Sequence, residues 1–171
     1  MEVENGIVNR VASSSLVVID LEDYYSPNPR VVIDLKDCLF QELILRESDF
    51  RQFISSHDWG QYKGCNVAIT CSVDAIIPAW AYMLVTSRLV PFVNYCIVGG
   101  LEDLERSLFQ LALSNFDSQK YIGAKVVVKG CGSVPVPMYA FGELVRRLVG
   151  VSGSVVYGEP CSTVPVYRGG K

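Results

Sequence analysis

Two stretches of the chain share one hydrophobic pattern. In each, a short apolar run typical of a β-strand ends near a cysteine, a turn-like loop follows, and a proline opens an apolar pattern with helical spacing. The predicted strands cover residues 66–70 and 125–129, the cysteines are Cys71 and Cys131, and the predicted helices cover 78–90 and 137–149. The pattern therefore predicts two copies of the same order: a strand, a cysteine and a helix.

The similarity extends beyond these stretches. Aligning the sequence with itself so that Phe50 falls on Phe109 also places Tyr62 on Tyr121, Val67 on Val126, Pro78 on Pro137, and Arg88-Leu89-Val90 on Arg147-Leu148-Val149. Self-similarity at a fixed offset is the signature of a repeat. We expect repeat one at 43–100 and repeat two at 101–159, each with the order helix, strand, cysteine loop, helix, strand.

The first helices of the repeats are predicted at 48–56 and 101–116, and their last strands at 94–98 and 154–157. Strands alternating with helical patterns indicate βαβ units and a parallel sheet. Apolar runs without alternation, such as Val126-Val127-Val128, are typical of strands that are covered on both faces.

The N-terminal part carries a different kind of repeat. The string at 16–23 returns almost unchanged at 30–37, on either side of Pro27-Asn28-Pro29. Proline fixes its own φ and restricts the preceding residue, so we expect a turn there and an antiparallel hairpin over 15–38. The acidic residues of this segment alternate with apolar ones, which favours a solvated face over a metal cluster.

Together these patterns predict an α/β fold: a mostly parallel sheet from two duplicated αβαβ units, extended by an N-terminal antiparallel hairpin. A chain of 171 residues fits one domain of roughly 100–200 residues, and no low-complexity linker separates the repeats. We therefore expect a single domain over 1–171, with an irregular tail at 160–171 lying across its body.

Charge and composition exclude several function classes. The net charge of −3, without a basic stripe, argues against nucleic-acid binding. The most apolar stretch, 75–85, is interrupted by Pro78 and is shorter than the about 20 residues of a membrane span. The first residues lack the pattern of a signal peptide, which favours a cytoplasmic location with mostly reduced cysteines. The sequence leaves a homo-oligomer open.

The cysteines give the candidate chemistry. In open α/β sheets, ligands gather beyond the carboxyl ends of the strands, where Cys71 and Cys131 are predicted. Thiols before a helix N-terminus are stabilised as thiolates, and Cys161 follows the last predicted strand. If these strands are neighbours, the three thiols converge and suit zinc or an iron–sulfur cluster, with Asp74, Glu159 or a donor from outside the chain as a fourth ligand. The alternative is three small residues near helix starts that bind nothing.

Other sites are weaker. The histidine His57 follows a predicted helix, where a polar helix end explains it more simply than a Cys-His dyad. Cys38, Cys65 and Cys96 are expected to be core or incidental. A catalytic thiol at Cys131 or Cys71 would need a base that the sequence does not show.

Four strings carry a family resemblance. They are Leu-Glu-Asp-Tyr-Tyr25, Ile-Thr-Cys-Ser72, Lys-Gly-Cys131 and Gly-Glu-Pro-Cys-Ser-Thr-Val-Pro165. From about Ile7 to Tyr167 the chain resembles a bacterial family of unknown function, found mainly in Bacteroidetes-type organisms. The resemblance implies a cytoplasmic accessory role in iron–sulfur cluster assembly or sulfur handling, with assembly proteins as partners. Its cysteine-bearing strings include Cys71, Cys131 and Cys161.

Two hypotheses of different classes follow. The first is a protein that binds a metal or an iron–sulfur cluster, or handles sulfur, through Cys71, Cys131 and Cys161. The second is a non-catalytic interaction module with structural cysteines. An enzyme with a cysteine nucleophile ranks third, because no base is evident.

Overall fold

The chain folds into two compact units. The structure is a computed structural model that describes residues 16–130, 132–159 and 162–170. Unit 1 comprises Met1–Tyr25 and Phe109–Lys171, and unit 2 comprises Ser26–Leu108. Each unit has its own sheet and its own core, so each is described by itself. Our expectation of a single domain stays a prediction.

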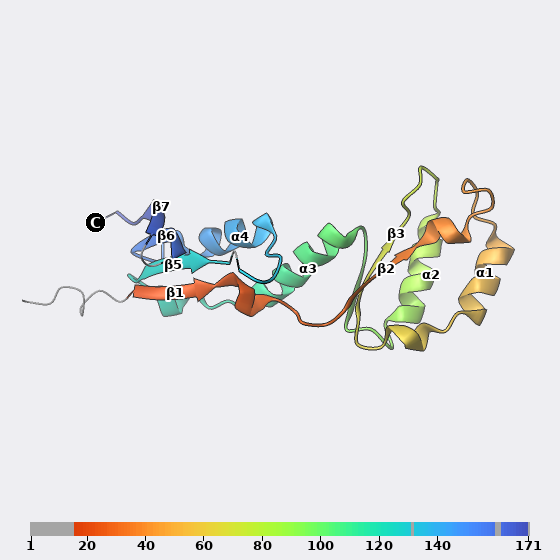
Figure 1. Ribbon diagram of the computed structural model, residues 1–171, viewed down its shortest axis with the longest axis horizontal. Helices are drawn as coiled ribbons and strands as arrows, with labels where there is room; N and C mark the ends of the chain where they lie inside the picture. The colour runs from red at the N-terminus through yellow and green to blue at the C-terminus, as the bar shows by residue number, and fades with distance from the viewer. Residues whose placement is uncertain (1–15, 131, 160–161, 171) are drawn as a thin grey trace, which may run out of the picture. The chain divides into compact units, whose positions relative to one another are not determined.

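Unit 2 is built on a three-stranded parallel sheet. Its strands are β2 (Arg30–Asp34), β3 (Asn66–Thr70) and β4 (Tyr95–Val98), in the order β2-β3-β4. One face packs against α1 (Glu47–Ser56) and α2 (Ala79–Leu89), which contact each other (Figure 1). The other face of β3 is covered at Ala68 by two leucines of α3 (Leu101–Ser114), Leu104 and Leu108.

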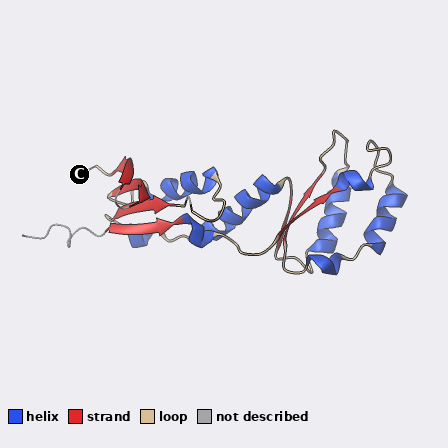
Figure 2. Cartoon of the chain, in the orientation of Figure 1, coloured by secondary structure: helices blue, strands red, loops and turns tan. Residues whose placement is uncertain are grey.

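Unit 1 is built on a four-stranded sheet. Its strands are β1 (Leu16–Asp20), β5 (Lys125–Lys129), β6 (Ser154–Glu159) and β7 (Ser162–Arg168), in the order β1-β5-β6-β7. The first three run parallel and β7 runs antiparallel to β6. Figure 2 shows the strands in red and the helices in blue. One core joins this sheet to α4 (Met138–Leu148) and to Phe109 and Leu113 of α3.

The two units share one order of elements. Each has a short strand and a 3₁₀ helix from the N-terminal part, paired in parallel with the strand that precedes a cysteine loop. The registers correspond, because Leu16 pairs with Lys125 in unit 1 and Arg30, its equivalent in the second N-terminal string, pairs with Asn66 in unit 2. The 3₁₀ helices are η1 (Leu21–Tyr24), η2 (Leu35–Cys38), η3 (Trp59–Tyr62) and η4 (Ser118–Tyr121).

An aspartate ends each N-terminal strand and begins the following 3₁₀ helix. The carboxylate of Asp20 accepts the N–H of Glu22 at 3.0 Å, and that of Asp34 accepts the N–H of Lys36 at 3.0 Å. Aspartate is a favoured N-cap because its oxygen satisfies an N–H that the helix itself leaves unpaired. The leucine that follows each aspartate, Leu21 or Leu35, is fully buried and fixes the turn to the core.

Two predictions about the architecture are wrong. The segment 15–38 is not an antiparallel hairpin, since β1 and β2 lie in different sheets and each pairs in parallel with a later strand. There are consequently two sheets in place of one. Apolar periodicity identifies a strand but does not select its partner, and both strings have the apolar character of strands in parallel sheets.

The C-terminal tail also departs from the expectation of irregular structure. Residues Ser162–Arg168 form β7, which pairs with β6 from Glu159↔Ser162 to Ser154↔Arg168. The ladder shifts register between Val155 and Val156. Pro165 suits this place because β7 pairs with β6 alone, and an edge strand tolerates a missing N–H donor.

Candidate functional site

A charged cavity lies at the carboxyl ends of the parallel strands of unit 1. Its volume is about 340 Å³. Strands β1, β5 and β6 and the segments that follow them supply its lining: Asp20, Glu22, Lys129, Gly130, Gly132, Tyr157, Gly158 and Glu159. Parallel strands place their ligands at this end, because the loops that follow the strands converge there.

An ion pair crosses two strands at the cavity. The ammonium of Lys129 lies 2.9 Å from Oδ2 of Asp20. Burial acts to raise the pKa of Asp20, but the bonds from Lys129 and from the N–H of Glu22 outweigh it and leave that pKa below its usual value. The same hydrogen bond from Asp20, with the charges of Asp20 and Glu159, raises the pKa of Lys129. Both groups are therefore ionised at neutral pH.

Glu22 holds the loop that follows β5. Its carboxylate accepts the N–H of Gly132, and the N–H and the hydroxyl of Ser133, both at 3.1 Å. The N–H of Ser133 contributes most to lowering the pKa of Glu22. With its oxygens engaged by the loop, Glu22 positions the wall of the cavity.

Two glycines allow the backbone to approach closely here. Gly130 has φ +155°, and a Cβ there would lie 3.0 Å from Cβ of Leu21 and 3.3 Å from the ring of Phe141. Gly158 has φ +121°, and a Cβ there would lie 2.5 Å from the carbonyl oxygen of Ser162. Glycine adopts such φ values without the steric penalty of other residues.

The comparison with known proteins gives a family. A family model described as "Protein of unknown function (DUF2480)" matches residues 5–169. The chain belongs to the DUF2480 family. No curated protein and no solved structure matches it. Membership of a family of unknown function agrees with the resemblance found in the sequence and assigns no chemistry.

Two of the three predicted metal ligands of this DUF2480 member, Cys131 and Cys161, lie outside the described residues. The chain neighbours of Cys131, Gly130 and Gly132, both line the cavity. Glu159, a predicted fourth ligand, lines it as well. The candidate thiols are thus close in sequence to the cavity lining.

The third predicted ligand, Cys71, belongs to unit 2. It is half-buried at the end of β3, and its Sγ lies 3.6 Å from the carbonyl oxygen of Val73. Asp74 is exposed in the same loop. Because β3 and β5 belong to different sheets, the argument that placed Cys71 and Cys131 on one sheet edge does not hold. Within residues 16–130, 132–159 and 162–170, no three His, Cys, Asp or Glu side chains are grouped closely enough to hold a metal.

The corresponding strand ends of unit 2 carry a different set of charges, since Asp34 there lies 3.7 Å from the ammonium of Lys36 on the following 3₁₀ helix. The carboxylate of Asp34 accepts the N–H of Ser72 at 3.0 Å, so it holds the loop after β3 as Glu22 holds the loop after β5. Burial acts to raise the pKa of Asp34, yet the bonds from Ser72 and Lys36 leave it lowered. In the alignment of the two repeats, Thr70 stands where unit 1 has Lys129, and Val98 where it has Tyr157.

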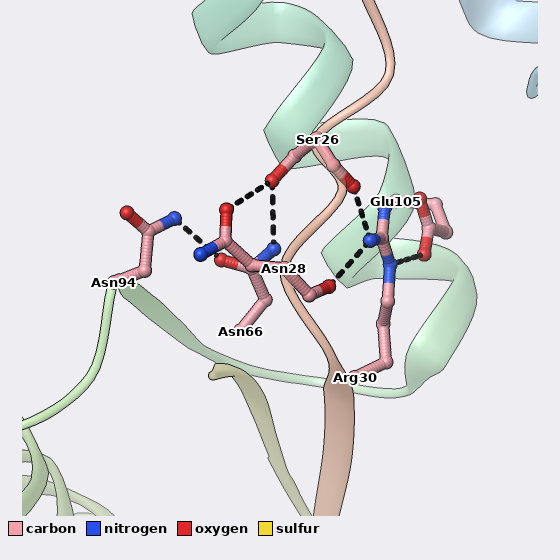
Figure 3. Close-up of polar contacts among 6 residues, drawn as sticks. All are labelled: Ser26, Asn28, Arg30, Asn66, Asn94 and Glu105. Atoms are coloured by element: carbon pink, nitrogen blue, oxygen red, sulfur yellow. Dashed lines mark hydrogen bonds and ion pairs between the residues drawn. The ribbon is translucent and has the colours of Figure 1, made fainter. Parts of the chain in front are cut away.

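The amino ends of the unit 2 strands are joined by a polar network (Figure 3). The guanidinium of Arg30 contacts Glu105 at 2.6 Å, and donates to the carbonyl oxygens of Ser26 and Asn28. The fully buried side chain of Asn66 donates to the Ser26 hydroxyl at 3.0 Å, and accepts from Asn94 at 2.7 Å. These groups satisfy one another, as buried polar groups do, which indicates a structural role.

His57 is a helix end, as its place in the sequence suggested. It is the C-cap residue of α1, and its Nε2 lies 2.8 Å from the Tyr62 hydroxyl. Its ring stacks on Tyr62 and contacts Phe53 and Trp59.

In the described part of the chain, no helix has the length and apolar character needed to cross a membrane.

Sequence reasoning found Glu159 but missed Asp20, Glu22 and Lys129 of the cavity. The alternation of acidic and apolar residues predicts a solvated hairpin face for Asp20 and Glu22, and no motif in the sequence singles out Lys129. The available signal was the return of the 16–23 string at 30–37, which marks the two strings as equivalent strands of two units.

Proposed function

We propose that the cavity of unit 1 binds a thiophilic metal ion, either zinc or the iron of an iron–sulfur cluster. Cys131 and Cys161 supply thiolates and Glu159 a carboxylate. The observation that carries the proposal is the lining of the cavity by Gly130 and Gly132, on either side of Cys131, and by Glu159, two residues before Cys161. Both proposed thiolate ligands are therefore close in sequence to residues that line the cavity.

The charges of the cavity support a cation. Asp20, Glu22 and Glu159 supply three carboxylates and Lys129 one ammonium, which Asp20 already pairs. Zinc is a cation of borderline softness, and both thiolates and carboxylates are among its protein ligands. The positive charge of Lys129, two residues before Cys131, favours the thiolate form that binds metal.

Cys71 and Asp74 remain predicted ligands under the same proposal. They stand at the equivalent strand end of unit 2, and the variants below decide whether the metal needs them. The biological role that we propose is that of a cytoplasmic accessory protein, of bacterial origin, that handles metal or sulfur together with cluster-assembly proteins. Its support is the family resemblance.

We also propose that the two units arose by duplication of one unit, extended by the N-terminal strings. The supporting facts are the constant offset between matched residues of the two repeats and the matching registers of β1 with β5 and of β2 with β3. On this proposal, the metal site is a later specialisation of unit 1.

Metal analysis tests the proposal directly. The protein is purified anaerobically, and its metal content and absorption spectrum are measured for the wild type and for Cys131→Ser, Cys161→Ser and Cys71→Ser. The matched control is Cys96→Ser, whose half-buried thiol lies inside β4. Circular dichroism confirms that each variant is folded.

We expect one equivalent of zinc or a cluster spectrum in the wild type and in the control, and its loss in Cys131→Ser and Cys161→Ser. Loss in Cys71→Ser as well would extend the site to all three cysteines. A wild type that stays free of metal after reconstitution with zinc, and with iron and sulfide, would overturn the proposal. The second candidate function, a non-catalytic interaction module with structural cysteines, would then be favoured.

A further inference from the structure

An apolar groove lies beside the charged cavity in unit 1. Its volume is about 580 Å³, and α4, β6 and β7 supply most of its lining. Side chains that face it include Met138, Phe141, Val145, Tyr157 and Val166. Met138 is 80% exposed and Val166 50% exposed, although both are apolar. Exposed apolar surface gathered around a hollow marks a binding site more often than single exposed residues do.

Gly142 keeps this groove open. It lies in the middle of α4 and lines the groove, and a Cβ built on it would meet no atom within 4 Å. A glycine in a helix interior lowers the stability of the helix by about 1 kcal/mol relative to alanine. The helical structure of α4 therefore does not explain why a glycine stands at position 142. The residue of α2 that aligns with it in the first repeat is Met83. Unit 1 thus leaves space where unit 2 carries a long side chain.

The groove meets the charged cavity at Tyr157. This residue lines both, and its ring packs edge-on against Phe141 at a centroid distance of 5.8 Å. Beyond Tyr157 lie Glu159 and the other carboxylates of the cavity. An occupant of the groove therefore has an apolar body and one end near negative charge.

We propose that the groove binds an amphiphilic organic amine, with an aliphatic chain in the groove and an ammonium group directed toward the carboxylates near Tyr157. The volume lies in the range of about 300–1,000 Å³ typical of small-molecule pockets. Apolar lining removes the chain from water, while the three carboxylates, only one of which is paired by the ammonium of Lys129, select a positive end over a negative one. The proposal goes beyond metal binding and does not depend on it.

The contribution of the head group can be tested with three probes that share an eight-carbon chain. Metal-free protein, held in a chelator, is titrated with n-octylamine, 1-octanol and sodium octanoate at pH 7, below the micelle limit. Binding is followed by calorimetry and by the methyl NMR signals of Met138, Val145 and Val166. We expect octylamine to bind about fivefold more tightly than octanol, and octanoate to bind most weakly, in line with partly exposed charge pairs.

Two substitutions of one residue give a matched pair. Gly142→Met fills the groove and should weaken octylamine binding at least about tenfold, because several methylene contacts are lost. Gly142→Ala leaves most of the groove open and should retain binding. Both variants should melt no lower than the wild type, since each removes a helix-interior glycine. Glu159→Gln should weaken octylamine and leave octanol unchanged.

Four outcomes overturn the proposal. They are the absence of octylamine binding, equal affinity for octanoate, unchanged binding in Gly142→Met, and self-association of the protein that Gly142→Met abolishes. The last would assign the groove to a second copy of the chain. The metal proposal is tested separately on the cysteine variants, so either proposal can fail alone. If both hold, zinc and octylamine weaken each other's binding by the same factor.

Discussion

The loop after β5 in unit 1 is held by Glu22, whereas the loop after β3 in unit 2 is held by Asp34. The two carboxylates come from different positions of the equivalent strings. In unit 2, Asp34 both caps its 3₁₀ helix and binds the loop at Ser72. In unit 1, Asp20 caps the helix and Glu22, two residues later, binds the loop.

This division of tasks explains the difference in chemistry. With the loop bound by Glu22, Asp20 is available to pair with Lys129, and Glu159 adds a third carboxylate. The corresponding strand ends of unit 2 carry Thr70 and Val98, so no equivalent ion pair forms between β2 and β3 in the described structure. The same order of strands and helices therefore supports a charged cavity in unit 1 and a largely structural loop in unit 2.

The largest expected effect tests whether the two cores are separate. Leu148 and Leu89 occupy aligned positions of the two repeats, and both are fully buried, in the cores of unit 1 and unit 2. Leu148→Ala and Leu89→Ala should each lower the free energy of unfolding by about 2–5 kcal/mol, through lost contacts and a cavity.

Hydrogen exchange after each substitution should show lost protection mainly in the unit that carries it. Urea denaturation of the two variants supplies the change in the free energy of unfolding. Equal loss of protection in both units would contradict the comparison, because it would mean that the two cores unfold as one.

A smaller effect is expected at Gly158 and Gly99, which lie near the carboxyl ends of β6 and β4. A Cβ at Gly158 would lie 2.5 Å from a backbone oxygen, whereas a Cβ at Gly99 would lie 2.8 Å from the side chain of Asp103, which can rotate away. We expect Gly158→Ala to cost about 3 kcal/mol and Gly99→Ala about 1–2 kcal/mol, since both also strain the backbone. Thermal denaturation measures the difference, and a larger cost at Gly99 would refute it.

The smallest effect concerns the two loop anchors. Asp34→Ala should cost about 1 kcal/mol as a lost cap. Glu22→Gln should speed hydrogen exchange at the amides of Gly132 and Ser133 by up to about tenfold, as expected for weakened hydrogen bonds. Amide exchange measured by NMR at neutral pH checks both loops, and unchanged exchange at Ser133 would exclude the anchoring role of Glu22.

The same anchors predict an acid dependence. The pKa values of Glu22 and Asp34 are lowered by the bonds that they accept from the loops. Their contribution to loop order is therefore complete above the ordinary carboxylate pKa of about 4, and is lost as the pH falls through the lower folded values. Titration of the side-chain carboxyl signals by NMR should give both values below those of the unfolded chain. A raised value for either group would contradict the assignment.

Much of the secondary structure could be predicted from the sequence. The strands 66–70 and 125–129 coincide with β3 and β5, and the helices predicted at 78–90 and 137–149 differ from α2 and α4 by one residue at each end. Apolar runs and helix-opening prolines are local signals, which is why they succeed. Strand pairing is not local, and the similarity of the two N-terminal strings suggested a hairpin that the structure does not contain.

Some residues of the candidate site could also be predicted from the sequence, and others could not. Glu159 could be placed at a strand end from sequence alone, and it lines the cavity. Lys129 could not be connected to Asp20, because most of the chain separates them and only the pairing of β1 with β5 brings them together. Gly142 carried no signal, since an interior glycine reveals its purpose only when the empty space beside it is known.

The α/β class, the matched order of elements and the cysteines at strand ends are all visible in the amino-acid sequence. They follow from periodicity, turn residues and the offset between repeats, which are signals that can be recognised without knowing any contact. The folded chain was needed to show that β1 and β2 join different sheets, and that their acidic residues meet a lysine in one unit and a threonine in the other. The pairing of strands depends on which distant segments bury each other's apolar faces. Local patterns in one sequence do not show which segments these are.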